Sequence, residues 1–518
     1  MAQLFGNVEL SGPVRKREPR DATPRFKPDC VRQIDALLGC LEEQVPAEHL
    51  ARGVWTIVKD LDTSAVEAGY SALGCRGYHP KRILAVWVYA SLIGFHHSTK
   101  VVRAFQTDAA FRWLCGGRSP SGPTLRRFRQ KHQGLFEAVI EQTVLKGYEA
   151  GLVELDKLAV DGLRVRAHAS QAAVRTKARS SRRLKELAEV EVEKLSAEEK
   201  EKHAEKVRKH EEAVSVCEER RVTSYATTND MAALMKFPSG ASAPGHRATV
   251  VSSGASARFV VGALVDASPT DHGKLEEALE HTRDSLERLE LRCNERISVT
   301  ADAGYFSDAD LQYAQKSQDW ADVLIKEAPA PRKYKDLFPR DRFTVHEDNT
   351  ASCPAGTKML GPYPNNKERT EFKWVGVGCG ECALKPRCTR GKVRAIQLNP
   401  SKERARQAMR DRMAQPGAIE RYNKRIATIE PVFSFLEDVM GFRRASSRHK
   451  DTVVAEFLLK ILAYNIDRLI RACRAVKRSL FMFRLLIVEV LSFKRRSGLA
   501  SGSRQWCWYR TLPLACLA

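Results

Sequence analysis

The chain has 518 residues, enough for two or three domains with a sizeable core, and its apolar and charged fractions of 43% and 29% are those of a globular protein. Its 86 Lys and Arg residues outnumber its 63 Asp and Glu residues, which gives a formal net charge of +23. An excess of this size favours a polyanionic partner, because each neutralised phosphate releases counterions. Ordinary solubilising charge is the simpler alternative.

Cysteine content and hydropathy exclude a secreted disulfide scaffold and argue against a membrane span. The thirteen cysteines are scattered along the chain, which is too sparse for a disulfide framework. The N-terminus lacks the apolar core of a signal peptide. The best membrane candidate, residues 479–493, is short and interrupted by Arg484 and Glu489, so a buried or amphipathic helix fits better than a span of about 20 residues. We therefore expect the protein to be located in a reducing cytoplasm.

The N-terminal part predicts a loose arm followed by helices. Residues 1–30 are rich in Pro and Arg and are expected to form a flexible arm, and residues 31–152 a helical domain. An apolar helix begins at Pro80, in the first-turn position that proline tolerates. Further helices are expected over 99–117 and within 119–152. Basic residues near the start of the last helix suit a DNA-docking module, and a helical bundle with a solvated basic face suits them equally.

From residue 156 the pattern changes to that of an α/β layer protein. The expected elements are a strand ending at Asp161, a charged helix over 175–221 inside an insertion of residues 175–235, a loop over 236–246, a β-hairpin over 247–268, a helix over 271–290, a strand, turn and helix over 296–315, and a strand over 321–327. The charged helix has only a ragged apolar stripe, so we expect one long solvated helix rather than a coiled coil.

Two aspartates follow apolar strands in this region. Asp161 comes after "KLAV" and Asp302 after "ISVTA", with a turn at Gly304. Ligand sites of α/β sheets lie at strand ends, and Mg²⁺ takes carboxylate oxygens. The pair is therefore a candidate for a divalent-cation site, in which two metal ions can serve phosphodiester chemistry. Taken singly, each aspartate is more simply explained as a turn or cap residue.

A third acidic candidate, Glu430, lies in a basic segment with a helical pattern. Pro431 follows it and biases Glu430 away from helical geometry. We therefore expect a break in the helix to orient the Glu430 side chain. The alternative is a salt bridge from Glu430 to Arg425 or Arg444.

These residues resemble a known family. The blocks "AVDGLRVRAHAS", "TADAGYFS" and "YNKRIATIEPVF" with its following "GFRR" are similar to the DDE transposases of bacterial insertion sequences. Tyr422, Arg425 and Glu430 match the family's Tyr–Arg–Glu–Lys signature. The resemblance also includes "YHPKRILAVWVYASLIGF", "SPSGPTLRRFRQKH" and the closing "ILAYNIDRLIR", so it covers roughly residues 60 to 471.

The resemblance implies an RNase H-like catalytic domain over residues 153–471, α/β with a mixed sheet flanked by helices, preceded by the all-helical domain. It implies Mg²⁺ or Mn²⁺ at Asp161, Asp302 and Glu430, hydrolysis of DNA at transposon ends, and joining of the freed 3′-hydroxyl to target DNA. Double-stranded DNA in a cytoplasmic nucleoid is the implied partner, bound by a homodimer or a larger assembly. The residues expected to position DNA or its phosphates are Tyr422, Arg425, Arg164, Arg166 and His168.

Two departures from the family pattern are visible. The signature lysine is expected seven residues after Glu430, two helical turns on and on the same face, and Glu437 stands there. Residues 472–518 form a divergent tail. These departures keep two alternatives open: a DNA-binding relative without catalysis, and a metal-dependent nuclease without strand transfer.

Four cysteines gather within a Gly- and Pro-rich insertion over residues 340–395, which we expect to have little core of its own. A Cys-x-x-Cys pair with two outlying cysteines can hold a tetrahedral structural zinc ion, and metal binding could fold such a segment. Relatives carry a similar Cys-rich segment. The alternative is four free thiols. The four residues are Cys353, Cys379, Cys382 and Cys388.

Overall fold

The computed structural model describes most of the chain, in two compact units of residues 1–468 and 469–518. The described residues are 24–35, 39–71, 75–219, 222–229, 232–254, 257–266, 268–291, 296–328, 336–346, 348–366 and 371–497. Most of the expected arm, up to residue 23, and the end of the expected tail, from residue 498, lie outside them. The described part of the tail belongs to a long helix, α16 (Lys450–Ser497).

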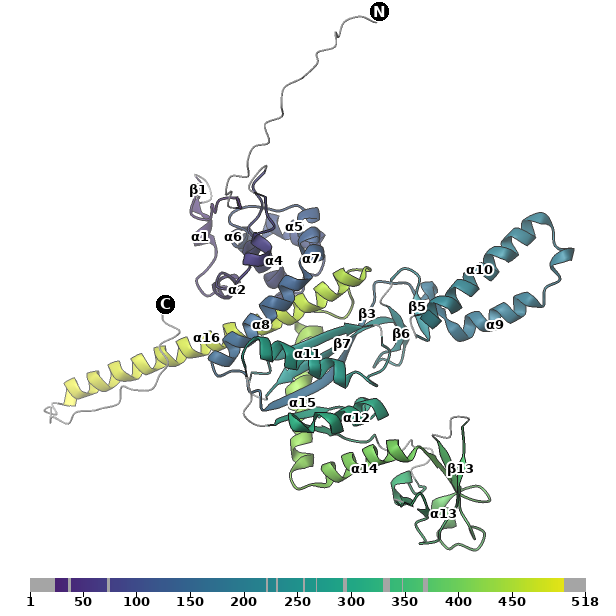
Figure 1. The fold of residues 1–518 in the computed structure, drawn as a ribbon. Helices are drawn as coiled ribbons and strands as arrows, with labels where there is room; N and C mark the ends of the chain where they lie inside the picture. The colour runs from purple at the N-terminus through teal and green to yellow at the C-terminus, as the bar shows by residue number, and fades with distance from the viewer. Residues whose placement is uncertain are drawn as a thin grey trace, which may run out of the picture. The chain divides into compact units, whose positions relative to one another are not determined.

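The N-terminal region is helical, as predicted (Figure 1). The apolar helix beginning at Pro80 is present as α4, and most of its side chains are buried. The single helix expected over 99–117 is two helices, because the Asp108 carboxylate accepts a hydrogen bond of 2.8 Å from the Ala110 N–H and caps a new start. The elements are β1 (Ile34–Asp35), β2 (Gly39–Cys40), α1 (Leu41–Gln44), α2 (Leu50–Val58), α3 (Ser64–Glu67), α4 (Pro80–Leu92), α5 (Ser98–Thr107), α6 (Ala109–Leu114), α7 (Gly122–Lys131) and α8 (Gln133–Glu149).

A mixed six-stranded sheet forms the centre of the larger unit, which confirms the α/β prediction. The order is β10–β9–β3–β7–β6, and β8 also pairs with β7. The central strand β3 runs antiparallel to β7 and parallel to β9, and β9 runs parallel to β10. The strands are β3 (Lys157–Arg166), β6 (Ala233–Lys236), β7 (Ser242–Ser253), β8 (Val260–Asp266), β9 (Ile297–Ala301) and β10 (Ala321–Ile325).

Helices cover both faces of this sheet (Figure 1). Helix α11 (Leu275–Arg288) packs on β7 and β8, and α15 (Ala418–Ser434) packs on β3, β7, β9 and β10. Helix α12 (Asp308–Lys316) connects β9 to β10, as expected, and packs against α14 (Pro400–Ala414). Successive residues of a central strand therefore point in turn toward the α11 side and toward the α15 side of the sheet.

Two expectations about the strands are wrong. Strand β3 does not end at Asp161 but continues to Arg166, because β7 pairs with it from Leu158 to Arg166 and satisfies its backbone groups. Residues 236–246 are not simply a loop, since β7 begins at Ser242 and forms a hairpin with β6.

The charged insertion is a pair of helices rather than one long helix (Figure 1). Helix α9 (Lys177–Ala188) and helix α10 (Ala197–Glu219) lie against each other. Two short strands, β4 (Val174–Thr176) and β5 (Ser224–Ala226), pair where the insertion leaves and rejoins the domain. The ragged apolar stripe is therefore divided between two partners that pack together.

The cysteine-rich region has a small core, contrary to the expectation that it has little. Trp374 is fully buried among apolar side chains, and its indole N–H donates a hydrogen bond of 3.0 Å to the Asn349 carbonyl. Burial of one large aromatic supplies much of the apolar area that so short a region needs. Its elements are β11 (Thr344–Val345), β12 (Ala351–Ser352), β13 (Leu360–Pro364), β14 (Phe372–Val375), α13 (Lys385–Cys388) and β15 (Ala395–Leu398).

Candidate active site

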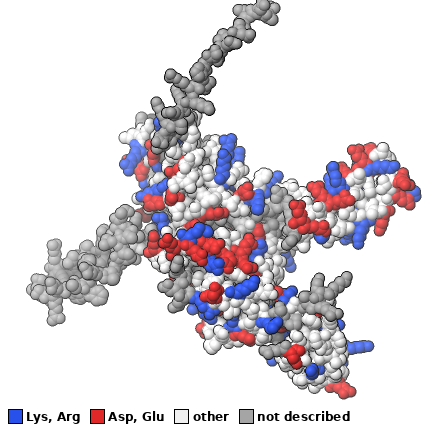
Figure 2. Space-filling view, in the orientation of Figure 1, with Lys and Arg blue, Asp and Glu red and all other residues white. Residues whose placement is uncertain are grey.

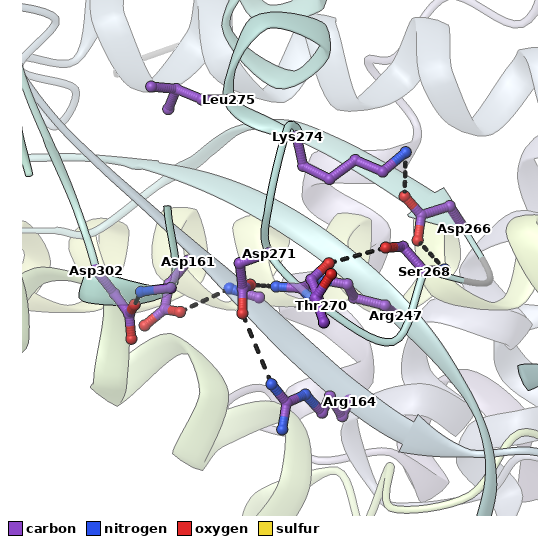
Figure 3. Close-up of polar contacts among 12 residues, drawn as sticks. Asp161, Arg164, Arg247, Asp266, Ser268, Thr270, Asp271, Lys274, Leu275 and Asp302 are labelled. Carbon is purple, nitrogen blue, oxygen red and sulfur yellow. Dashed lines mark hydrogen bonds and ion pairs between the residues drawn. The ribbon is translucent and has the colours of Figure 1, made fainter. Parts of the chain in front are cut away.

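The two aspartates lie at the same level of adjacent parallel strands. Val160 of β3 pairs with Ala301 of β9, the last pair of that ladder, so Asp161 and Asp302 follow it on the two strands (Figure 3). Asp302 directly follows the end of β9 and accepts a hydrogen bond from the Gly304 N–H, which fixes the turn. The structure thus brings these two predicted residues together.

Asp161 is largely buried and ion-paired. Its Oδ2 atom lies 2.7 Å from Nη1 of Arg425, which reaches it from α15, and the two side chains are 18% and 11% exposed. Burial raises the pKa of Asp161, the Arg425 guanidinium opposes this rise, and the charge of Asp302 adds to it. Tyr422 lies one turn before Arg425 and is half-buried; burial also raises its pKa. Arg425 thus contacts the aspartate pair directly, and the Tyr422 ring lies beside the Arg425 guanidinium.

Glu430 is not placed with this pair. It follows Arg425 by five residues, which is about 140° around an α-helix and so on a different side of α15. The Glu430 side chain is exposed. It makes no hydrogen bond or ion pair within the described part of the chain, neither to Arg425 nor to Arg444.

The helix does not break at Pro431, contrary to the prediction. Pro431 lies inside α15 and has no N–H to donate to the carbonyl four residues earlier. That carbonyl, of Ala427, instead accepts a hydrogen bond of 2.7 Å from Nε of Arg258. The irregularity comes later, as a π-helical turn over Phe435–Val439.

Glu437, which replaces the signature lysine, lies in this π-helical turn. Seven residues therefore do not equal two α-helical turns here, and Glu437 does not follow the register assumed from the sequence. Its side chain is partly buried, burial raises its pKa, and the charge of Arg443 opposes the rise.

The three basic residues after Asp161 separate into two groups. Nη1 of Arg164 donates a hydrogen bond of 3.0 Å to the Lys236 carbonyl, and Nη2 lies 3.6 Å from Asp271. Arg166 and His168 lie further along the chain, beside the segment after α15: the Arg166 carbonyl accepts a hydrogen bond from Ala445, and burial together with nearby arginine charges lowers the pKa of His168.

Asp271 and Arg247 are site residues that the sequence reading missed. Asp271 lies in the connection between β8 and α11, four residues before α11 begins, and not in the helix expected there. It forms an ion pair with Arg247 of β7, which is fully buried (Figure 3). The available signal was the sequence "TDHG", a short polar segment between strand β8 and helix α11.

Neither predicted metal set is complete in its geometry. Within the described ranges, no three His, Cys, Asp or Glu side chains form a group that could hold a metal ion. The four cysteines of the insertion are free thiols that line one cavity. Burial raises the pKa of Cys388, and the neighbouring thiols add to this rise. The four sulfur atoms are therefore neighbours without being arranged as a closed tetrahedral set.

Two family models match the chain. The model described as "Transposase domain (DUF772)" matches residues 39–131, in the helical N-terminal region. The model described as "Transposase DDE domain" matches residues 352–470, which include the four cysteines and the Tyr422–Glu430 signature. The two matches support a DDE-type transposase. Both matched segments of this transposase leave out Asp161 and Asp302, so these two assignments depend on the geometry described above.

Other comparisons add little to this identification. No curated protein matches the transposase. A cryo-EM structure of the piggyBac transposase synaptic complex with hairpin DNA is similar to it with a TM-score of 0.33 and 11% identity, over 92% of this chain and 84% of that one. A likeness this low carries no argument about fold or mechanism.

Charge and hydropathy of the described residues add two observations. The face drawn in Figure 2 is mixed, with basic and acidic side chains interspersed and acidic ones gathered over α11. The excess of basic residues is thus not visible there as one uniform patch. None of the described helices is long and apolar enough to cross a membrane.

Proposed function

We propose that this transposase cuts DNA at the ends of an insertion sequence and joins the freed 3′-hydroxyl ends to target DNA. The observation that carries the proposal is the position of Asp161 and Asp302 at one level of two adjacent parallel strands, with Arg425 in contact with Asp161. Family membership supports the substrate, and the excess of basic residues fits a polyanion.

The catalytic domain, residues 153–471, is proposed to be RNase H-like. Three antiparallel strands β3, β7 and β8 are followed by α11 and by the parallel strands β9 and β10 on the other side of β3. This order supports the proposal and places the C-terminal end of β9 beside the middle of β3. The helical region of residues 31–152 is proposed to recognise the element's ends or to mediate assembly.

The proposed cation is Mg²⁺ or Mn²⁺, held by Asp161 and Asp302. Two carboxylates at adjacent strand positions fit the oxygen-rich coordination of these ions. A divalent cation supplies positive charge that promotes attack of water or a 3′-hydroxyl on a phosphodiester. Glu430 is proposed as the third ligand of a two-metal site, for which its side chain would have to come closer to the pair, since the described residues hold no group of three such side chains.

The remaining site residues are proposed to bind and orient DNA. Arg425, which contacts Asp161, and Tyr422 beside it would position the scissile phosphate, and Arg164 presents a partly exposed guanidinium nearby. Arg166 and His168 would contact phosphates further along the strand. A proton-transfer role is not proposed for His168, because water activated by a metal ion needs no dedicated base.

The proposed reaction also has a consequence for the oligomeric state. Joining two ends requires at least two active sites, so we propose a homodimer or a larger assembly on DNA, within the cytoplasmic nucleoid.

We also propose a structural zinc ion among Cys353, Cys379, Cys382 and Cys388, supported by their shared cavity. Four thiolates would complete a tetrahedral zinc shell.

The test uses a supercoiled plasmid that carries the element's own ends, with Mg²⁺ and the full chain. Excision with joining of 3′ ends to a second plasmid supports the proposal. Nicking without joining indicates a metal-dependent nuclease. Loss of cleavage in Asp161→Asn supports the assigned site, and retained cleavage in that variant overturns it.

A second candidate function is DNA binding without catalysis. The exposed position of Glu430 and the acidic Glu437 favour it, because neither residue then serves the site that the signature describes. Retention of the plasmid with no cleavage, in Mg²⁺ and in Mn²⁺, would establish this function.

A further inference from the structure

Asp271 reaches both segments that carry the site aspartates. A Cβ atom placed on Gly162 would lie 2.5 Å from Oδ1 of Asp271. A Cβ atom placed on Gly304 would lie 2.8 Å from Oδ2 of Asp271 and 2.9 Å from Oδ1 of Asp302. Asp271 therefore occupies its position only because glycine follows Asp161 at once and follows Asp302 after one residue.

Asp271 approaches from the side of the sheet opposite to Arg425. Successive side chains of a strand point to opposite faces, and Asp161 contacts Arg425 of α15 whereas position 162 faces Asp271. The cross-strand partner of Arg164 on the same face is Arg247. Asp271 thus lies behind the aspartate pair and is not aligned with Asp161 as a third metal ligand.

The two arginines beside Asp271 are like charges placed opposite each other. Such a pair is destabilising unless a counter-charge lies between its members. Asp271 provides it, because its carboxylate forms ion pairs with Arg247 and, at 3.6 Å, with Arg164 (Figure 3). The Arg247 side chain is 0% exposed, whereas that of Arg164 is 35% exposed. One guanidinium is therefore held inside and the other is presented to solvent.

Arg164 is fixed from two directions. Its Nη1 donates to the Lys236 carbonyl and its Nη2 faces Asp271. A guanidinium fixed in this way keeps an exposed edge and loses little further freedom when it binds a phosphate.

We propose that Asp271 is a positioning residue that holds the Arg164 guanidinium, through the balanced Arg164–Arg247 pair, at the edge of the site for a DNA phosphate. The inference rests on the proposed function, because it requires Arg164 to contact DNA. It differs from a plain counter-ion role for Asp271, which would concern Arg247 and the stability of the fold.

The test is a double-mutant cycle on DNA binding, measured by fluorescence anisotropy with a short labelled duplex over a range of salt concentrations. Arg164→Ala should weaken binding about three- to tenfold and reduce the salt slope by about one. Asp271→Asn should weaken binding similarly, although it removes a negative charge. The double variant should bind no more weakly than either single variant.

Three results would overturn the inference. Tighter binding by Asp271→Asn would mean that Asp271 merely repels DNA. Unchanged binding, or losses that add in the double variant, would mean that Asp271 acts independently of Arg164. Absence of any duplex binding by the wild-type chain would remove the phosphate from the proposal. Glu277→Gln is the matched control, because Glu277 lies in the first turn of α11, shortly after Asp271, but pairs with Lys274 at 3.1 Å.

A second variant keeps the inference testable if Asp271→Asn does not fold. Arg164→Lys retains the charge but has no fork to bridge the Lys236 carbonyl and Asp271. Positioning predicts that it binds as weakly as Arg164→Ala, and full binding by Arg164→Lys would contradict positioning. Because the cycle measures binding, a chain that binds DNA without cutting it would refute the proposed chemistry and still decide the role of Asp271.

Discussion

The Arg425 guanidinium lies 2.7 Å from the Asp161 carboxylate and joins helix α15 to the central strand β3. Both side chains are mostly buried, so each charge depends on the other for compensation. The same contact places a signature residue of α15 directly on a proposed metal ligand. Stability and the state of the site are therefore linked through this pair.

Removing Arg425 should destabilise the fold markedly. Arg425→Ala leaves the Asp161 carboxylate buried without its partner, which costs about 3–5 kcal/mol when one member of a buried pair is lost. The free energy of unfolding in urea measures this. The matched control is Arg421→Ala, which breaks a more exposed pair of the same helix, at 2.8 Å from Asp322 of β10, and should cost about 1 kcal/mol or less. Equal losses in the two variants would show that the Asp161 pair has no special burial.

The pH dependence of stability should reveal the raised pKa of Asp161. Burial and Asp302 raise this pKa above the ordinary value of 3.8, so the folded state binds the proton more tightly than the unfolded state. Stability from this group is then fully present below pH 3.8 and is lost as the pH rises through the folded pKa. Relative to Asp161→Asn, the melting temperature of the wild-type chain should fall across this window. A rise across the same window would contradict the direction of the shift.

The contact between Arg258 and the Ala427 carbonyl should matter only while residue 431 is proline. Arg258→Ala removes the donor that replaces the missing N–H, at a cost of about 1 kcal/mol. In a Pro431→Ala background the new N–H can satisfy Ala427, so the same Arg258→Ala change should cost much less. The free energies of unfolding in urea of the wild-type chain, Arg258→Ala, Pro431→Ala and the double variant measure the coupling between the two positions. Equal costs in both backgrounds would show that Arg258 does not substitute for the missing hydrogen bond.

The zinc content of the purified protein tests whether the four cysteines of the cysteine-rich region bind a metal ion. If the four thiols hold zinc, the purified chain should contain about one zinc per chain by elemental analysis, and Cys382→Ser should lose it. Cys75→Ala, at an exposed cysteine outside the cavity, should retain it. Full zinc content in Cys382→Ser would contradict the ligand assignment, and its absence from the wild-type chain prepared with zinc would contradict the site.

Much of the fold, and the proximity of Asp161 and Asp302, could be predicted from the sequence. The strand segments that precede Asp161 and Asp302 are short apolar runs, and their parallel pairing brings both residues to one level. The length of β3 could not be predicted in this way. The strand continues past Asp161 because β7 supplies hydrogen-bond partners for its backbone, and a local sequence pattern does not reveal these partners.

The remainder of the site depended on contacts between distant segments. Pro431 predicts a break when read locally, but Arg258, far away in the sequence, supplies the donor that lets α15 continue. The resulting continuous helix turns Glu430 away from the aspartates. Asp271 became recognisable only when the chain placed it beside Gly162 and Gly304.

The central claim, that Asp161 and Asp302 together form the site that cuts DNA, is tested most directly by Mn²⁺-dependent cleavage of plasmid DNA carrying the element's ends. The wild-type chain should cut, and Asp161→Asn and Asp302→Asn should each lose cleavage by at least about a hundredfold while still binding the plasmid. The control Asp322→Asn, whose carboxylate pairs with Arg421 away from the pair, should cut normally. Cleavage that survives in either Asp161→Asn or Asp302→Asn would contradict the account.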